Sequence, residues 1–129
     1  MSDQVEYLGR KYDKEKETIF KQADIFAFPT YYSNECFPLV LLEAMQVSLP
    51  ILSTDEGGIS SIIEEGKTGF LIPQKNSKVL AEKLQILIEQ PELRVKMGQE
   101  GFKKYNEEFT LAKFEESLTS ILNKTIAKC

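Results

Sequence analysis

Two carboxylates, Glu35 and Glu43, are the side chains of this chain best suited by type and separation to bind or transform a ligand. Glu35 lies in a loop directly before an apolar helix and Glu43 about a turn and a half inside it, so roughly 10 Å separates them. Carboxylates accept strongly from paired hydroxyl groups, which predicts a ligand with hydroxyls at two ends, such as a nucleotide sugar. The plainer interpretation is that the helix dipole favours the first acid and that water solvates the second.

A strand and a helix must position both acids. The apolar run at residues 25–28 is typical of a parallel strand covered on both faces. In the helix, Leu39, Leu42 and Met45 share one face, and Pro38 fits the first turn because its missing N–H is not needed there. The sequence thus predicts a helix N-terminus at the carboxyl end of a parallel strand, where open α/β sheets bind anionic ligands.

Three more short strands are predicted, at residues 5–8, 50–53 and 69–72. A helix is predicted over residues 11–22, between the strands at 5–8 and 25–28. Gly57 and Gly58 follow the strand at 50–53. Paired glycines permit positive φ and close backbone approach, so this loop either presents N–H groups to a ligand or only turns the chain into a helix near Ile59.

The last third of the chain is predicted to be helical. Asn76 or Ser77 caps one helix, Pro91 opens the next and Thr110 starts the last. Apolar residues at helical spacing predict core packing for all three helices, through Leu80, Leu84, Leu87 and Ile88, through Leu93, Met97 and Phe102, and through Leu111, Phe114, Leu118, Ile121 and Leu122. These elements together predict an α/β fold.

Composition limits the classes of function. A chain of 129 residues with 42% hydrophobic residues and a net charge of -4 predicts one soluble domain with neither a nucleic-acid footprint nor a membrane span. The first residues lack the basic and apolar regions of a signal peptide, so we expect a cytosolic chain. Two cysteines and no histidine predict no disulfide framework and no transition-metal site, and they leave the Cys36 thiol without a histidine base.

Four motifs occur in order between Val5 and Phe109: A-D-I-F-A-F-P-T, E-C-F-P-L-V-L-L-E, P-I-L-S-T-D-E-G-G and G-K-T-G-F-L-I-P. Together they resemble the carboxyl-terminal half of family 4 retaining glycosyltransferases with the GT-B fold, of the "glycosyl transferases group 1" type. The resemblance implies a partial, Rossmann-like, three-layer domain of about four strands with helices on both faces. Residues 1–129 would be a truncated C-terminal donor-binding domain that lacks the N-terminal acceptor domain.

The resemblance also implies roles for individual residues. Glu35 would face the hydroxyls of the transferred sugar, or act as a general base or as the nucleophile of a double displacement, and Glu43 would hold the ribose. Between them, backbone N–H groups would lie near the sugar and phosphates, from Cys36, Phe37, Leu39 and Val40, whereas Pro38 has no N–H to donate. Cys36 stands where the family usually has glycine, which would trim the sugar pocket.

Two further loops are implied to lie near the donor. Gly9, Arg10 and Lys11 would touch the nucleotide base, although a solvated turn explains the two cations equally well. Gly57 and Gly58 would lie beside the donor pocket. The implied donor is a UDP- or GDP-sugar that serves as substrate, with no cofactor and no metal.

The implied reaction moves a hexose from the nucleotide-diphosphate sugar to a saccharide or lipid-linked acceptor with retention at the anomeric carbon. We expect this chain to be inactive alone, because positioning two substrates requires the second domain. The full-length enzyme would be cytoplasmic and peripheral to the inner membrane. Two alternatives stay open, a nucleotide-sugar 2-epimerase-like domain and a non-catalytic nucleotide-sugar-binding or assembly subunit.

The strand at residues 5–8 is expected to lack its usual neighbours, because the resemblance begins at the third strand of the family's domain. It would then pair directly beside the strand at 25–28, or an exposed sheet edge would recruit another chain. Unpaired strand edges promote association, so the second possibility predicts a homo-oligomer.

Overall fold

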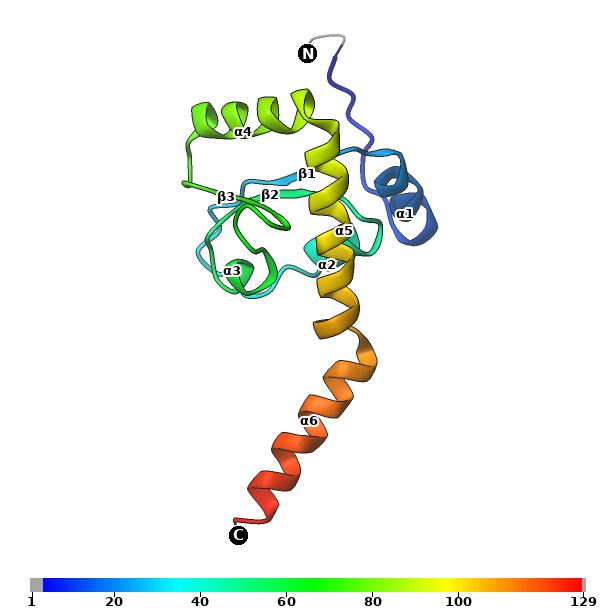
Figure 1. Ribbon diagram of the computed structural model, residues 1–129, viewed down its shortest axis with the longest axis vertical. Coiled ribbons are helices and arrows are strands. Elements are labelled where there is room, and N and C mark those ends of the chain that lie inside the picture. Colours follow the sequence, from blue (N-terminus) through cyan, green and yellow to red (C-terminus); the bar gives the residue numbers. More distant parts are fainter. Residues whose placement is uncertain (1–3, 129) are drawn as a thin grey trace.

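A computed structural model of the chain describes residues 4–128. It contains a three-stranded parallel sheet in the order β1-β2-β3, with helices on both faces (Figure 1). The strands are β1 (Phe26–Phe28), β2 (Ile51–Thr54) and β3 (Gly69–Ile72), and the helices are α1 (Asp13–Gln22), α2 (Leu39–Gln46), α3 (Ile59–Ile62), α4 (Ser77–Glu89), α5 (Pro91–Glu108) and α6 (Leu111–Ile126). The predicted α/β class with a parallel sheet is confirmed.

The central strand β2 separates two apolar clusters, because successive side chains of a strand point to opposite faces. Ile51 belongs to the cluster formed with α2 and α3, which includes Leu41 and Ile59. Leu52 belongs to the other cluster, with Leu87 of α4. Figure 1 shows the same arrangement, with α4 on one side of the sheet and α2 and α3 on the other. Helices on both faces, as predicted, are therefore confirmed.

Two polar side chains of β2 tie the carboxyl end of β1 in place. Ser53 Oγ donates to the carbonyl of Phe28 at 2.6 Å, and Thr54 Oγ1 donates to the carbonyl of Thr30 at 2.5 Å. Both side chains are buried, and these bonds satisfy them. The loop that follows β1 thus starts from a fixed point.

The predicted strand at residues 5–8 is wrong. The segment has no strand structure, its side chains Val5, Tyr7 and Leu8 are exposed, and β1 pairs with β2 alone within the described part of the chain. A short extended segment is stable only when a neighbouring strand and a buried face support it. No such support reaches residues 5–8, so pairing beside β1 does not occur. The predicted helix over residues 11–22 is present but begins at Asp13.

The predicted core packing of the last helix is also wrong. α6 extends away from the body of the molecule (Figure 1), and none of its described residues is buried. Its apolar stripe is exposed instead, at Leu111, Phe114, Leu118, Ile121, Leu122 and Ile126. The preceding α5 has 18 residues, which span about 27 Å at 1.5 Å each, so the chain has passed the sheet before α6 begins.

The helix boundaries agree well with the sequence signals. Asn76 caps α4 by accepting from the Val79 N–H at 3.1 Å, Pro91 is the first residue of α5, and Thr110 accepts from the Lys113 N–H at 3.3 Å before α6. In α4 and α5, Ile88 and Phe102 were predicted to face the core but are exposed, and Leu39 on the apolar face of α2 is exposed as well. Between residues 4 and 128, no helix is both long and apolar enough to cross a bilayer.

Candidate functional site

The loop after β1 is held by backbone hydrogen bonds and carries Glu35. The Tyr32 N–H donates to Thr30 Oγ1 at 3.2 Å, and the Glu35 N–H donates to the Tyr32 carbonyl at 2.9 Å. The second bond closes a turn through Ser33 and Asn34. Glu35 itself is half-buried, and its carboxylate has no hydrogen bond or ion pair within residues 4–128. This acid is thus positioned by its backbone and free to act on a ligand.

Backbone N–H groups gather where the loop enters α2. The amides of Cys36, Phe37, Leu39 and Val40 have no hydrogen-bond acceptor among the described residues, whereas the Leu41 N–H donates to the Pro38 carbonyl at 3.1 Å. The first turn of α2 contains no acidic residue. Unpaired N–H groups at a helix N-terminus attract anions, and no side chain of that turn opposes this here.

Gly57 and Gly58 pack against the backbone of the same loop. The Gly58 N–H donates to the Cys36 carbonyl at 2.5 Å, and a Cβ on Gly57 would lie 1.9 Å from the Glu35 carbonyl oxygen. Gly57 also has a φ of +54°, which favours glycine. The close approach expected of these glycines is therefore present, but its partner is the Glu35 loop. Contact of either glycine with a donor stays a prediction.

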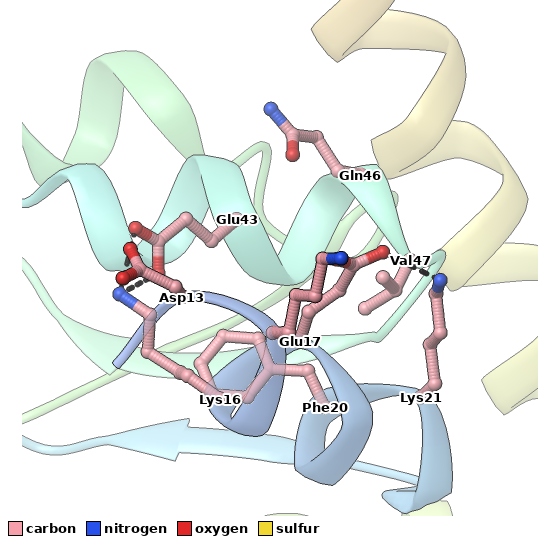
Figure 2. A pocket seen from close by; sticks show the side chains of 9 residues that line it. Asp13, Lys16, Glu17, Phe20, Lys21, Glu43, Gln46 and Val47 are labelled. Carbon is pink, nitrogen blue, oxygen red and sulfur yellow. Dashed lines mark hydrogen bonds and ion pairs between the residues drawn. The ribbon is translucent and has the colours of Figure 1, made fainter. Parts of the chain in front are cut away.

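Glu43 projects from α2 toward α1, where Lys16 binds it (Figure 2). Lys16 Nζ donates to Oε1 of Glu43 at 2.9 Å and lies 2.7 Å from Oε2, an ion-pair distance without hydrogen-bond geometry at that oxygen. Oε2 is buried and lies beside the Lys16 ammonium. A ligand that needs both oxygens of Glu43 must first displace the Lys16 ammonium.

A pocket of about 540 Å³ lies between α1 and α2 around this ion pair (Figure 2). We call it the α1–α2 pocket; it is lined by Asp13, Lys14, Lys16, Glu17, Phe20, Lys21, Glu43, Gln46 and Val47. Its rim holds a second ion pair, in which the hydrogen bond from Lys21 lowers the pKa of the Glu17 carboxyl. Its volume lies in the range of small-molecule sites, and both ammonium groups and an aromatic ring line it.

The predicted residues fall into separate groups. Glu35 is joined to Gly57 and Gly58, whereas Glu43 lines the α1–α2 pocket, which does not include Glu35. The two acids share the start of α2, because Glu35 precedes it and Glu43 belongs to it. No group of three or more histidine, cysteine, aspartate or glutamate side chains gathers among residues 4–128 in a way that could hold a metal ion.

Gly9, Arg10 and Lys11 lie in the irregular segment before α1 and outside the α1–α2 pocket. Gly9 has a φ of +70° with open space around it. Lys11 Nζ lies 3.7 Å from the carboxylate of Glu15 in the first turn of α1. A role for these residues at a nucleotide base stays a prediction.

Sequence reasoning missed Lys16 and Phe20 as walls of the pocket. Lys16 and Glu43 are 27 positions apart, and no motif links them. Phe20 packs against Phe26 of β1 with ring centroids 5.1 Å apart, which brings α1 beside the sheet. Nothing in the sequence pointed to Lys16, because it meets Glu43 only through the packing of α1 against α2.

Comparison with known protein families identifies a family that matches this chain. The family described as "Glycosyl transferases group 1" matches residues 1–104, which is most of the chain. Among similar proteins, D-inositol 3-phosphate glycosyltransferase of Corynebacterium efficiens is 30% identical over 97% of this chain and 29% of its own length. Capsular polysaccharide biosynthesis glycosyltransferase CapM of Staphylococcus aureus is 30% identical over 82% of this chain and 27% of its own.

Solved structures share the fold of this chain. Sucrose-phosphate synthase from Thermosynechococcus elongatus superposes with a TM-score of 0.84 at 24% identity, over 98% of this chain and 31% of that one. HepE of Anabaena, solved in complex with UDP and glucose, superposes with a TM-score of 0.83 at 22% identity, over 95% of this chain and 32% of that one. The chain therefore spans about a third of the length of these similar proteins or less.

Proposed function

This chain belongs to the group 1 glycosyl transferases, and on that basis we propose that it forms the part of a GT-B transferase that binds the nucleotide-sugar donor. The observation that carries the proposal is the start of α2, where four unpaired N–H groups, of Cys36, Phe37, Leu39 and Val40, lie between two carboxylates. An anionic diphosphate suits the N–H groups. The hydroxyl groups on either side of it suit Glu35 and Glu43.

In the proposed complex, Glu43 accepts hydrogen bonds from the ribose hydroxyls once Lys16 has moved away. Glu35 accepts from hydroxyls of the transferred hexose, and the amides stabilise the negative charge that develops on the leaving diphosphate. Fixed backbone dipoles that stabilise developing charge commonly contribute more to the rate of such transfers than any other effect. Glu35 as general base or as nucleophile in a double displacement stays a second form of the proposal, with retention at the anomeric carbon in each case.

The acceptor, a saccharide or a lipid-linked sugar, requires surface beyond this chain in our proposal. The relatives extend over about three times the length matched here, and a second domain would hold the acceptor against the donor. We therefore expect the 129-residue chain alone to transfer no sugar. Detectable transfer by the purified chain would contradict this expectation.

The first test is a thermal-shift titration with UDP, GDP, UDP-glucose and GDP-mannose. A ligand at a hundred times its dissociation constant stabilises the folded state by about 2.7 kcal/mol, which gives a clear rise in Tm. We expect one nucleotide class to stabilise the chain, and HepE in complex with UDP makes UDP the first to try. No shift with any of the four would overturn the donor-binding proposal.

A specific observation favours a second candidate, an assembly role. The edge of β1 that faces away from β2 pairs with no strand among the described residues, and Ala27 on β1 is exposed. An unpaired edge is a template for a strand of another chain, so we propose that a further copy or a further domain covers it. A light-scattering mass that stays monomeric at all concentrations would exclude the homo-oligomer.

A further inference from the structure

A groove separate from the α1–α2 pocket lies at the carboxyl edge of the sheet. It is made of two hollows of about 390 and 310 Å³ that share Pro29 and Tyr31. Pro29 follows β1 directly and Pro73 follows β3, which places the groove where parallel strands end. Open α/β sheets bind ligands at this edge. We call this feature the tyrosine groove.

The walls of the tyrosine groove are those of a small-molecule site. Ile72, Pro73 and Leu80 form an apolar side, and Tyr31 lines both hollows. Tyr31 and Tyr32 are 62% and 60% exposed, although the loop that carries them is anchored at both ends. Large aromatic rings held in place on a fixed loop bind at low cost in conformational entropy.

Polar groups with unused hydrogen-bonding capacity line the other side. Asn76 accepts from the Val79 N–H through Oδ1, which leaves its amide donors for a ligand. Lys75 Nζ lies 5.0 Å from the centre of the Tyr31 ring and has no carboxylate partner in the described chain. Neither it nor the Ser77 hydroxyl makes a hydrogen bond within residues 4–128. Amide, ammonium and hydroxyl donors around an aromatic face match a ring that carries hydroxyl groups.

From this combination we propose that the tyrosine groove binds a neutral sugar ring, as the surface through which this chain contacts the acceptor saccharide that the second domain would hold. The apolar C–H face of a pyranose packs against Tyr31, and its hydroxyls meet Lys75, Asn76 and Ser77. A phosphate-rich ligand fits less well, because Lys75 is the one cation that lines the groove within the described residues. The assignment to the acceptor rests on the proposed donor function, whereas the binding of a sugar ring in the groove does not.

The groove is also close to the acid predicted to face the transferred sugar. The hydrogen bond from the Glu35 N–H to the Tyr32 carbonyl closes a turn, and the ends of such a turn lie less than about 7 Å apart. The backbone of Glu35 therefore lies close to the loop that carries the tyrosines, although Glu35 lines neither hollow of the groove. Transfer requires proximity of acceptor and donor sugar.

The test is a series of ¹H–¹⁵N NMR titrations of the full chain with methyl α-glucopyranoside, methyl α-mannopyranoside and methyl β-galactopyranoside. We expect at least one sugar to give saturable shifts at the amides of residues 30–33 and 74–77. Tyr31→Ala should weaken that binding by about two- to tenfold, and Tyr31→Phe should retain it because the ring remains. Tyr12→Ala is the matched control, since Tyr12 is 65% exposed and lies outside the groove.

Three results would overturn the proposal: no saturable shift with any of the three sugars, shifts confined to the α1–α2 pocket, or equal losses for Tyr31→Ala and Tyr12→Ala. Tyr32→Ala is a second variant if Tyr31→Ala perturbs the loop, which the spectrum reports directly. A UDP titration of the same samples separates the two proposals. UDP shifts at residues 36–40 report on the donor site, and a UDP loss in Tyr31→Ala would assign the groove to the nucleotide instead.

Discussion

The two acids of the candidate site are held in opposite ways. Glu35 lies on a loop whose backbone is fixed by hydrogen bonds and by the glycines of the next loop, while its carboxylate is unpaired in the described chain. Glu43 lies on a helix that needs no such support, but Lys16 holds its side chain. The position of Glu35 therefore depends on backbone packing, whereas the availability of Glu43 depends on a displaceable cation.

The largest effect should come from breaking the backbone support of Glu35. Gly57→Ala puts a Cβ 1.9 Å from the Glu35 carbonyl oxygen at a φ of +54°, so we expect it to lower the free energy of unfolding by at least about 3 kcal/mol. Gly66→Ala is the control, because Gly66 has a φ of +74° but no neighbour within 4 Å. The control should lose only about 1 to 2 kcal/mol in urea unfolding. Equal losses would show that the loop contact carries no stability.

The second largest effect should come from removing the charge with which Glu43 binds the ligand. Glu43→Gln removes the charge that would accept from the ribose hydroxyls, so UDP affinity measured by calorimetry should fall about tenfold or more. Glu17→Gln is the control, since Glu17 lines the same pocket but pairs with Lys21. If both variants lose affinity equally, the effect is one of pocket charge and Glu43 has no special role.

The third effect should have the opposite sign. Lys16→Met removes the ammonium that pairs with the Glu43 carboxylate, and a partly exposed ion pair of this kind opposes ligand binding only weakly. We expect UDP to bind about two- to fivefold more tightly. Lys14→Met controls for the general loss of positive charge, because Lys14 lines the pocket without a salt bridge in the described chain. Weaker binding than in the control would show that Lys16 contacts the ligand itself.

The smallest effect on nucleotide affinity should come from changing Glu35. Glu35→Gln should leave UDP affinity within about twofold of the original, because this acid is proposed to meet the hexose alone. UDP-glucose should lose its advantage over UDP in the same calorimetric titrations. A matched loss for both ligands would place Glu35 at the nucleotide and would remove the contrast between the two acids.

The sequence predicted strands correctly where a short apolar run also has neighbours to pack against in the folded chain. β1, β2 and β3 were predicted from short apolar segments, and all three lie between helices as expected. The segment at residues 5–8 has a similar pattern, yet it forms no strand. Strand formation is decided by neighbours, and a pattern of a few residues contains no information about whether a neighbour is present.

The helices show the same limit. The apolar stripe of α6 predicted a helix correctly, because period alone determines that outcome, but burial requires a surface opposite the stripe. Ile88 and Phe102 are exposed for a related reason, since the second cluster buries Leu87 and Met97, with Leu80, Leu84 and Leu93 packed against it, and does not extend to these two positions. Sequence period thus locates helices better than it locates the core.

For the candidate site, the sequence and its resemblance to a family supplied Glu35, Glu43 and the glycines as predictions. The structure added what joins them to the rest of the molecule, which are contacts between residues far apart in the chain. Lys16 reaches Glu43 across 27 positions, and Gly58 binds the Cys36 carbonyl. Long-range pairs of this kind follow from how α1, α2 and the two loops pack, and no local pattern encodes them.

The hydrogen bond from the Gly58 N–H to the Cys36 carbonyl makes the Gly58 amide a reporter of ligand binding at the start of α2. The Cys36 carbonyl accepts from Gly58, and the Phe37 N–H of the same peptide group is one of the unpaired amides at the start of α2, so an anion bound there polarises the carbonyl that Gly58 binds. Ile59, the first residue of α3, is next in sequence and is buried in the cluster formed with α2, so the Gly58 amide is held between the Cys36 carbonyl and the core. Deuterium exchange at the Gly58 amide would therefore report whether an anion occupies the start of α2.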